Sequence, residues 1–286
     1  MSGERRRSRE GGQRQRGRDG EEPGVALEEG PPEETSGRYV YCVIQADRGL
    51  DFGPVGMGNE PAVVYTVNFK DIAAVTSAAP LEVYDPTREN VLAHERVNES
   101  VMRDFTVIPM SFGTVFKTDQ DIVELLKTAY DAFRDVLEKM KNKLEFGLKV
   151  LWEPEAVISE IEKDHDNLRL LRQEISSQEG STYFARMQYG RLVDSLLQER
   201  SEAVAGEILA GLRDVAVASR INKPIGEKMI LNAAFLVGRD REEDFDAKVK
   251  EVAARYEHLN FKYTGPWPPY NFVNIRLKLE RAAEGG

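Results

Sequence analysis

Residues 263–273 read YTGPWPPYNFV, and the C-terminal part of the chain is organised around this stretch. It contains three of the thirteen prolines and one of the two tryptophans. Proline fixes φ at about −65° and has no N–H for a strand ladder, so we expect residues 265–269 to form a stiff arch outside any sheet. From Val273 to Leu279 apolar and polar side chains alternate, which predicts a final strand with one buried face.

The aromatic side chains of the arch have two interpretations. Trp267 and Tyr270 lie on a rigid segment, and a rigid segment costs little entropy to order against a partner, which favours recognition of another protein. The alternative is that Trp267 folds back as a lid over the protein's own core, since most large aromatic side chains are largely buried. The sequence leaves both open.

Bulk properties narrow the class of protein. A chain of 286 residues has room for about two domains. A net charge of −10 argues against nucleic acid as a partner, because phosphate binding needs a concentrated basic face. The single cysteine, Cys42, can form no internal disulfide, and no apolar stretch is long enough to span a membrane. With no secretory signal at the N-terminus, we expect a cytoplasmic protein.

Residues 1–37 have the composition of a disordered tail. Residues 2–18 are rich in arginine, glycine and glutamine, and residues 19–34 turn acidic with three prolines. Such a segment buries too little apolar surface to offset the entropy of ordering it. The arginines are candidates for contact with RNA or an acidic surface, but a solvated linker is the favoured interpretation.

From residue 38 the patterns predict an α+β protein of two domains. Residues 38–141 give strands, a helix, an extended segment and a helix, and residues 142–281 give a strand, helices, a strand, a helix and two strands. We expect two modified ferredoxin-like domains, the second enlarged by a helical insertion over about residues 154–219. The predicted strands are 39–45, 62–69, 72–77, 146–152, 228–237 and 260–264; the predicted helices are 86–103, 119–140, 154–176, 182–219 and 240–259.

The sequence contains only weak motifs for catalysis, phosphate binding or metal binding. Residues 49–58 are glycine-rich but lack the Gly-Lys-Ser/Thr ending of a phosphate loop. His94 and Glu95 are adjacent in a predicted helix, where consecutive side chains point about 100° apart and form no shared site by themselves. The other histidines, His165 and His258, match no metal or catalytic-triad spacing. We therefore expect no metal and no cofactor, with His94 a histidine bonded to a nearby carboxylate or carbonyl. The alternative is an enzyme that uses His94 and Glu95 in a cleft between domains.

Six stretches of the chain form a pattern when they are taken together. They are 38–44 (RYVYCVI), 71–77 (DIAAVTS), 92–116, 145–150 (EFGLKV), 180–185 (GSTYFA) and 263–273. The arch and the run from Leu92 to Phe116, which includes His94-Glu95, are specific in combination. Together these stretches resemble the gas vesicle accessory proteins of the F and L type. The tail before residue 38 is not part of the resemblance.

The resemblance implies two modified ferredoxin-like domains and a non-enzymatic role in gas vesicle assembly or nucleation, through contact with the small hydrophobic shell protein and other accessory proteins. A shell protein exposes apolar surface before it polymerises, and rigid aromatic side chains suit such a surface. The alternative is a regulatory protein that binds a small molecule between paired domains. The candidate partner-binding residues are Trp267, Pro268, Tyr270 and Phe272 on the arch, with Phe112 and Phe116 as a second cluster.

Overall fold

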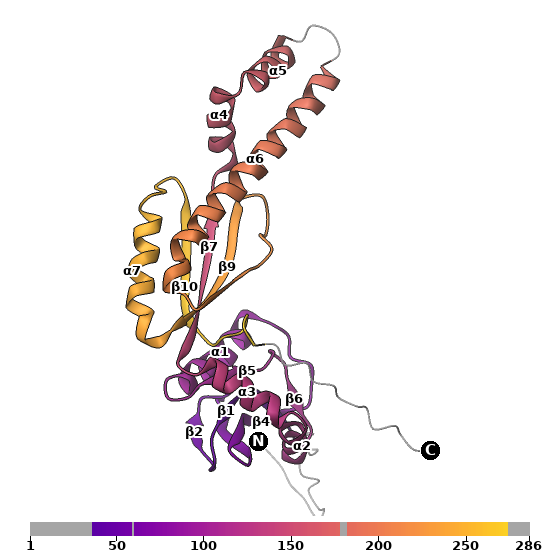
Figure 1. Ribbon diagram of the computed structural model, residues 1–286. Helices are drawn as coiled ribbons and strands as arrows, with labels where there is room; N and C mark the ends of the chain where they lie inside the picture. The colour runs from indigo at the N-terminus through magenta and orange to yellow at the C-terminus, as the bar shows by residue number, and fades with distance from the viewer. Residues whose placement is uncertain (1–35, 59, 178–181, 274–286) are drawn as a thin grey trace, which may run out of the picture. The chain divides into compact units, whose positions relative to one another are not determined.

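The computed structural model describes residues 36–58, 60–177 and 182–273. The predicted tail, apart from its last two residues, and the final strand beyond Val273 lie outside these ranges. The described residues form two antiparallel β-sheets with helices packed against them (Figure 1). The predicted α+β class is confirmed.

The first sheet is built on β1 (Ser36–Gln45), whose apolar residues are almost all buried. The strand order is β2-β3-β4-β1-β5, and β6 also pairs with β1. Lys70, at φ 51°, lies in the tight turn between β3 and β4, the gap between the predicted strands 62–69 and 72–77. The other strands of this sheet are β2 (Asp51–Pro54), β3 (Val63–Phe69), β4 (Ile72–Pro80), β5 (Val107–Pro109) and β6 (Val115–Phe116).

Helices cover both faces of the first sheet. Helix α1 (Arg88–Met102) packs Val97 and Val101 into a buried cluster with the tyrosines of β1. On the other face α2 (Asp119–Thr128) and α3 (Tyr130–Met140) contribute to a second cluster around Val40 and Val43. The sheet is therefore buried on both sides, which explains why β1 reads as a nearly continuous apolar run.

The second sheet has the strand order β10-β7-β9-β8, with all pairs antiparallel. Its strands are β7 (Lys143–Leu151), β8 (Ala218–Ile221), β9 (Met229–Gly238) and β10 (Asn260–Trp267). Helix α7 (Glu242–Ala253) and the C-terminal part of α6 cover one face, where Phe146, Phe235 and Phe245 pack together. Along β7 the buried Phe146, Leu148 and Val150 alternate with the less buried Gly147 and Lys149.

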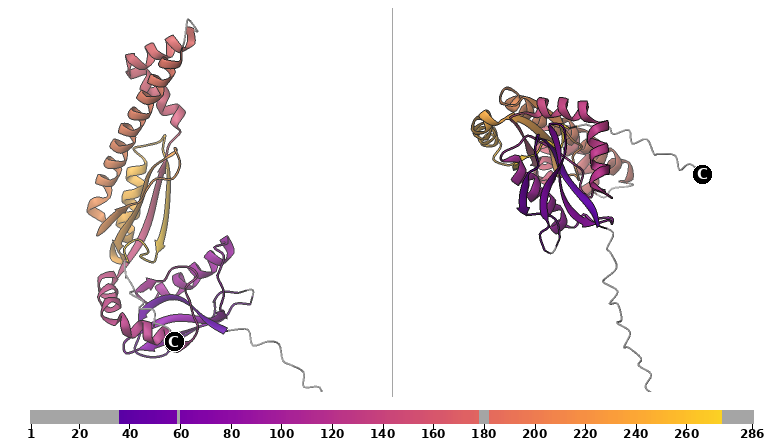
Figure 2. Two further views of the ribbon diagram at one scale, coloured as in Figure 1. Left: turned by 90° about the vertical axis from the view of Figure 1, so that its right-hand side faces the viewer. Right: turned by 90° about the horizontal axis from the view of Figure 1, so that it is seen from below.

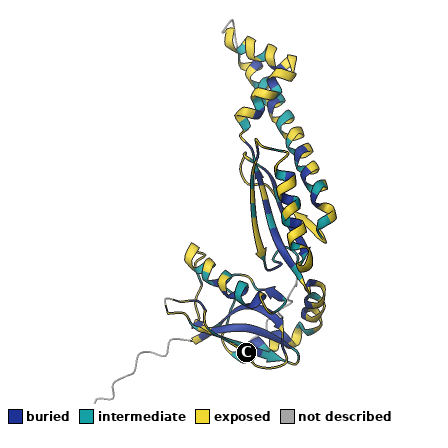
Figure 3. Cartoon of the chain, turned by 90° about the vertical axis from the view of Figure 1, so that its left-hand side faces the viewer, coloured by how far each residue is buried: buried dark blue, intermediate teal, exposed yellow. Residues whose placement is uncertain are grey.

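Three helices connect β7 to β8: α4 (Pro154–Asp164), α5 (Asp166–Ser177) and α6 (Tyr183–Leu212). A short 3₁₀ turn, η1 (Arg213–Val215), follows α6, and a second, η2 (Arg239–Arg241), precedes α7. Helix α6 runs along the second sheet and continues past its end, where α4 and α5 pack beside it (Figures 1 and 2). Figure 3 shows that most residues of this extension are exposed.

Some predicted boundaries were wrong for local reasons. Helix α1 begins at Arg88 with Thr87 as its N-cap, not at Pro86 after Asp85. The predicted helix 119–140 breaks at Ala129, whose φ of −106° and ψ of 16° are not helical. The stretch 154–176 breaks at His165, which has an extended backbone. Helix α7 begins at Glu242, after 3₁₀ turn η2, and not at residue 240.

Two strands were not predicted, and a third was predicted to end too early. β2 lies in the stretch predicted as a glycine-rich loop, and β8 lies where the end of a helix was expected. β10 continues through Pro266 to Trp267, although residues 265–269 were expected to leave the sheet. The pairing shifts between Thr264 and Trp267, and β10 is an edge strand, which is where a strand tolerates proline. Within the described ranges no helix is long and apolar enough to cross a membrane.

Candidate functional site

The site is the junction, by which we mean residues 267–273 together with the residues of α1 and β7 that they contact. It begins where β10 ends. Gly265 has φ +126°, and a Cβ there would lie 2.9 Å from both the Glu145 carbonyl oxygen and Phe146 Cδ1. Only glycine meets both requirements without strain. The chain then turns so that Trp267 lies opposite Glu145 of β7.

A carboxylate of β7 holds the segment that follows. Glu145 is 4 % exposed, and its two carboxylate oxygens accept from the Asn271 backbone N–H at 2.7 Å and the Asn271 side-chain amide at 2.6 Å. Burial raises the pKa of Glu145, while the bonds from Asn271 oppose that shift. Arg220 of β8 donates to the Asn271 carbonyl oxygen at 2.7 Å, so Asn271 is fixed by two strands.

A second set of polar contacts joins the same segment to helix α1. The Asn98 amide donates to the Tyr270 hydroxyl at 3.0 Å and lies 2.9 Å from His94 Nε2. His94 Nδ1 lies 3.0 Å from the Tyr39 hydroxyl, which also accepts from the Gly113 backbone N–H at 2.9 Å. Side chains from β1, α1 and the C-terminal segment therefore form one connected polar row.

Burial shifts the pKa values of the titratable side chains in this row. It lowers the pKa of His94 to about 4, so the imidazole is neutral near neutral pH. It raises the pKa of Glu95, and burial together with the Glu95 carboxylate raises the pKa of the Tyr270 hydroxyl. His94 is 1 % exposed and both ring nitrogens are engaged. Its partners are the Tyr39 hydroxyl and the Asn98 amide, and a hydrogen bond to the Met110 backbone opposes the fall in its pKa.

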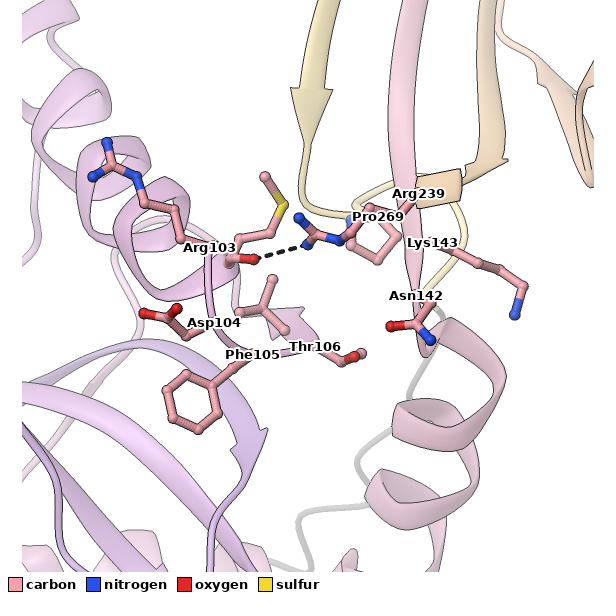
Figure 4. A pocket seen from close by; sticks show the side chains of 10 residues that line it. Arg103, Asp104, Phe105, Thr106, Asn142, Lys143, Arg239 and Pro269 are labelled. Atoms are coloured by element: carbon pink, nitrogen blue, oxygen red, sulfur yellow. Dashed lines mark hydrogen bonds between the residues drawn. The ribbon is translucent and has the colours of Figure 1, made fainter. Parts of the chain in front are cut away.

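A cavity of about 210 Å³ lies beside the junction. Its walls come from the end of α1 with the residues leading into β5, from the start of β7, and from Arg239 and Pro269 (Figure 4). Arg239 donates to the Met102 carbonyl oxygen at 2.9 Å, which satisfies a carbonyl at the C-terminal end of α1. The visible role of Arg239 is therefore to join η2 to α1.

The predicted partner-binding residues lie in two places. On the arch, Pro268 is buried, and Trp267, Tyr270 and Phe272 are half-buried. Phe112 packs its ring edge-on to Tyr39 and His94, with centroids 6.3 and 5.9 Å apart, at the far end of the polar row. Phe116 is in β6 and packs against the second buried cluster, as does Val273. The structure thus places Tyr270 and Phe112 along the same polar row and Phe116 apart from it.

The sequence analysis missed Asn98, Glu145 and Asn271. Asn98 follows His94 by four residues, so both occupy one face of α1 between the buried Val97 and Val101. A polar pair at this spacing inside an apolar stripe is a usable signal for a buried hydrogen bond. Glu145 and Asn271 are 126 positions apart, and no local pattern connects them. The described residues include no group of three or more His, Cys, Asp or Glu side chains placed to hold a metal ion.

Structure comparison gives the class: the fold is that of gas vesicle proteins. The crystal structure of gas vesicle protein GvpF from Anabaena sp. PCC7120 superposes with a TM-score of 0.73 at 26 % identity, over 85 % of this chain and 100 % of that one. GvpF from Microcystis aeruginosa gives a TM-score of 0.71 at 22 % identity, over 84 % of this chain and 99 % of that one.

Sequence comparison then gives the family. The family model described as gas vesicle synthesis protein GvpL/GvpF matches residues 37–274, and the chain belongs to this family. Gas vesicle protein F2 of Halobacterium salinarum is 30 % identical over 87 % of this chain and 97 % of its own length. Gas vesicle protein L of Streptomyces sp. is 28 % identical over 83 % and 93 %. The resemblance drawn from the sequence is confirmed, and with it a gas vesicle accessory role.

Proposed function

We propose that this protein is a non-enzymatic assembly factor of gas vesicles that binds the small hydrophobic shell protein and other accessory proteins in the cytoplasm. The observation that carries the proposal is the family match over residues 37–274, which covers almost all of the described chain. The junction supports it chemically. Most of its buried polar groups bond one another, an arrangement that rigidifies a fold and holds the arch in one conformation.

We also propose two domains, 38–141 and 142–281, of which the second is ferredoxin-like. Its elements run strand, helices, two strands, helix, strand, with the spatial order β10-β7-β9-β8. This is a βαββαβ chain whose first crossover has grown to three helices. The first domain has four strands before its first helix, so its order of elements departs further from the ferredoxin-like pattern.

The arch residues remain the proposed partner contact, with a division of roles. Tyr270 and Asn271 are engaged inside the protein, so replacing them tests the fold. Trp267 and Phe272 are half-buried and keep surface for a partner. Loss of an interface aromatic that anchors binding costs about 2 kcal/mol or more, which is a loss of at least about 30-fold in affinity.

Co-expression with the shell protein tests the proposal. Wild type is expected to retain the shell protein through affinity purification, and a folded Trp267→Ala variant is expected to lose it. Tyr183→Ala, at a 73 % exposed position on the helical extension, is the matched aromatic control and is expected to behave as wild type. If wild type retains neither the shell protein nor another gas vesicle protein, the proposed function is wrong. If Trp267→Ala binds as wild type does, the arch is not the contact.

For the small-molecule alternative, the cavity of about 210 Å³ beside the junction is the location between the two domains. A second candidate, a cavity of about 340 Å³, lies between residues 54–58 with Pro61 and helix α1, and its lining includes the polar side chains of Glu89, Asn90 and Arg96. A metabolite that raises the melting temperature of wild type, but not of an Ala93→Trp variant that fills this cavity, would support it.

A further inference from the structure

The helical extension carries a groove between α4 and α6 that is separate from the junction. Its volume is about 260 Å³. A cavity of about 150 Å³ accommodates benzene, so the groove has room for a leucine or isoleucine side chain. Its apolar surface comes from Val157, Ile161 and Leu196, with Ala203 at the exposed edge. Helices α4 and α6 lie side by side along it (Figure 1).

Carboxylates stand on both rims. Glu160 and Asp164 are four residues apart on α4, and Glu199 lies opposite them on α6. All three are exposed, and none forms an ion pair with any residue in the described ranges. Arg200 is the one arginine or lysine in the lining, so three carboxylates face one guanidinium. The groove is therefore apolar at its floor and acidic at its edges.

We infer that this groove binds an amphipathic helix that inserts a large aliphatic side chain and carries lysine or arginine on both flanks. Two packed helices with an apolar furrow between them accept a third by ridge-into-groove packing. The acidic rims select a basic partner and reject an acidic one, because like charges brought together at an interface are costly. The inference rests on the proposed function in one respect: it assigns this surface to the contact with another gas vesicle protein.

A designed peptide tests the chemistry without a natural partner. The probe is a helical peptide with leucine at heptad-like spacing and lysine elsewhere, labelled for fluorescence anisotropy at physiological salt and added to the full chain. Its sister peptide has glutamate in place of every lysine. Wild type is expected to bind the lysine peptide at least about tenfold more tightly than the glutamate peptide, a difference of about 1.4 kcal/mol.

Two pairs of variants separate groove binding from general attraction to an acidic protein. Glu160→Gln/Asp164→Asn/Glu199→Gln is expected to weaken lysine-peptide binding at least about tenfold. The control Asp131→Asn/Glu243→Gln/Glu257→Gln makes the same change in net charge at exposed positions elsewhere and is expected to bind as wild type. Ala203→Trp fills the groove edge and is expected to block binding, whereas Ala210→Trp, also exposed on α6 but outside the groove, is not.

Equal binding by the two triple variants, or unimpaired binding by Ala203→Trp, would overturn the inference. The same variants are then co-expressed with the shell protein and the other accessory proteins. If each is retained in full by groove variants that no longer bind the peptide, the groove is not the partner contact, although the proposed function stands. If wild type binds the peptide but retains no gas vesicle protein, the proposed function fails and the groove remains a peptide site.

Discussion

The Asn98 side-chain amide donates to the Tyr270 hydroxyl at 3.0 Å and so joins helix α1 to a segment 172 positions later in the chain. The same amide contacts His94 on its own helix, and His94 in turn contacts Tyr39 of the first sheet. Asn98 is fully buried, and its carbonyl oxygen has no partner in the described part of the chain. Removing a hydrogen-bond partner of a buried side chain such as Asn98 leaves a polar atom unsatisfied, which lowers the free energy of unfolding.

Tyr270→Phe removes the hydroxyl from this contact and keeps the ring. We expect the free energy of unfolding to fall by about 1–3 kcal/mol, because the amide of the fully buried Asn98 loses an acceptor. Urea denaturation followed by circular dichroism measures the change. Tyr183→Phe, at an exposed position, is the control and should change stability by less than about 0.5 kcal/mol. Equal stability of the two variants would show that the contact contributes nothing.

Glu145 and Asn271 should be energetically coupled. Glu145→Ala leaves two donors of Asn271 without an acceptor, and Asn271→Ala removes one of them. In a double-mutant cycle we expect a coupling energy of about 1–3 kcal/mol. The cycle Glu145→Ala with Lys149→Ala, a residue on the same strand, should be additive. A coupling below about 0.5 kcal/mol for the first pair would mean that Asn271 is held by other contacts.

Gly265→Ala and Gly206→Ala should shift stability in opposite directions. At Gly265 the positive φ and the contacts at 2.9 Å make any side chain strained, and we expect a loss of about 1–3 kcal/mol. Gly206 is exposed within α6, with nothing within 4 Å of an added Cβ, so alanine should stabilise by up to about 1 kcal/mol. Thermal unfolding of the two variants measures both signs. A gain at Gly265 would contradict the backbone geometry described for the end of β10.

Stability should depend on His94 between about pH 6.5 and pH 4. The pKa of His94 falls from 6.5 to about 4 in the folded protein, so the stabilising neutral form is fully present above pH 6.5. As the pH falls towards 4 the unfolded chain takes up a proton that the folded chain does not. The resulting loss is about 3 kcal/mol at most.

Two buried carboxyl groups act in the opposite sense. The pKa values of Glu95 and Glu145 are raised, so their contribution becomes more favourable as the pH falls. The contribution of His94 is therefore measured as the difference in the free energy of unfolding between wild type and a His94 variant. Wild type and His94→Gln are unfolded in urea at several pH values between about 7 and 4.5, and the stability advantage of wild type should shrink as the pH falls. An advantage that does not change with pH would show that His94 titrates normally.

Predictions from sequence succeeded where the signal is local. Helix α2 begins at Asp119, where the predicted helix begins, and Thr118 and Asp121 form a capping box in which each side chain accepts from the other's backbone N–H. The β3–β4 hairpin and the alternating strand β7 also follow from short patterns. β8 was missed because its four exposed residues have no apolar alternation, and only pairing with β9 makes them a strand. The junction was missed because its bonds join residues 126 and 172 positions apart.

The arch around Pro268 shows which features the local sequence predicts and which depend on contacts with distant residues. The prolines indicated a rigid turn, but not whether its aromatic side chains face a partner or the protein's own core. The structure buries Pro268 and bonds Tyr270 and Asn271 internally, whereas Trp267, the residue of the lid interpretation, is half-buried. Trp267 and Phe272, half-buried at either side, are where recognition of a partner remains to be tested.

The chain passes between its two sheets twice. It leaves helix α3 at Met140 to enter β7, and after β10 it returns so that Tyr270 and Val273 contact the first sheet and its helices. Two domains joined by one linker can rotate about that linker. Here the chain connects the domains at two places, which restrains both their rotation and their separation. A protease cut at the exposed Lys141 should therefore leave two fragments that still migrate together under native conditions and come apart only in denaturant.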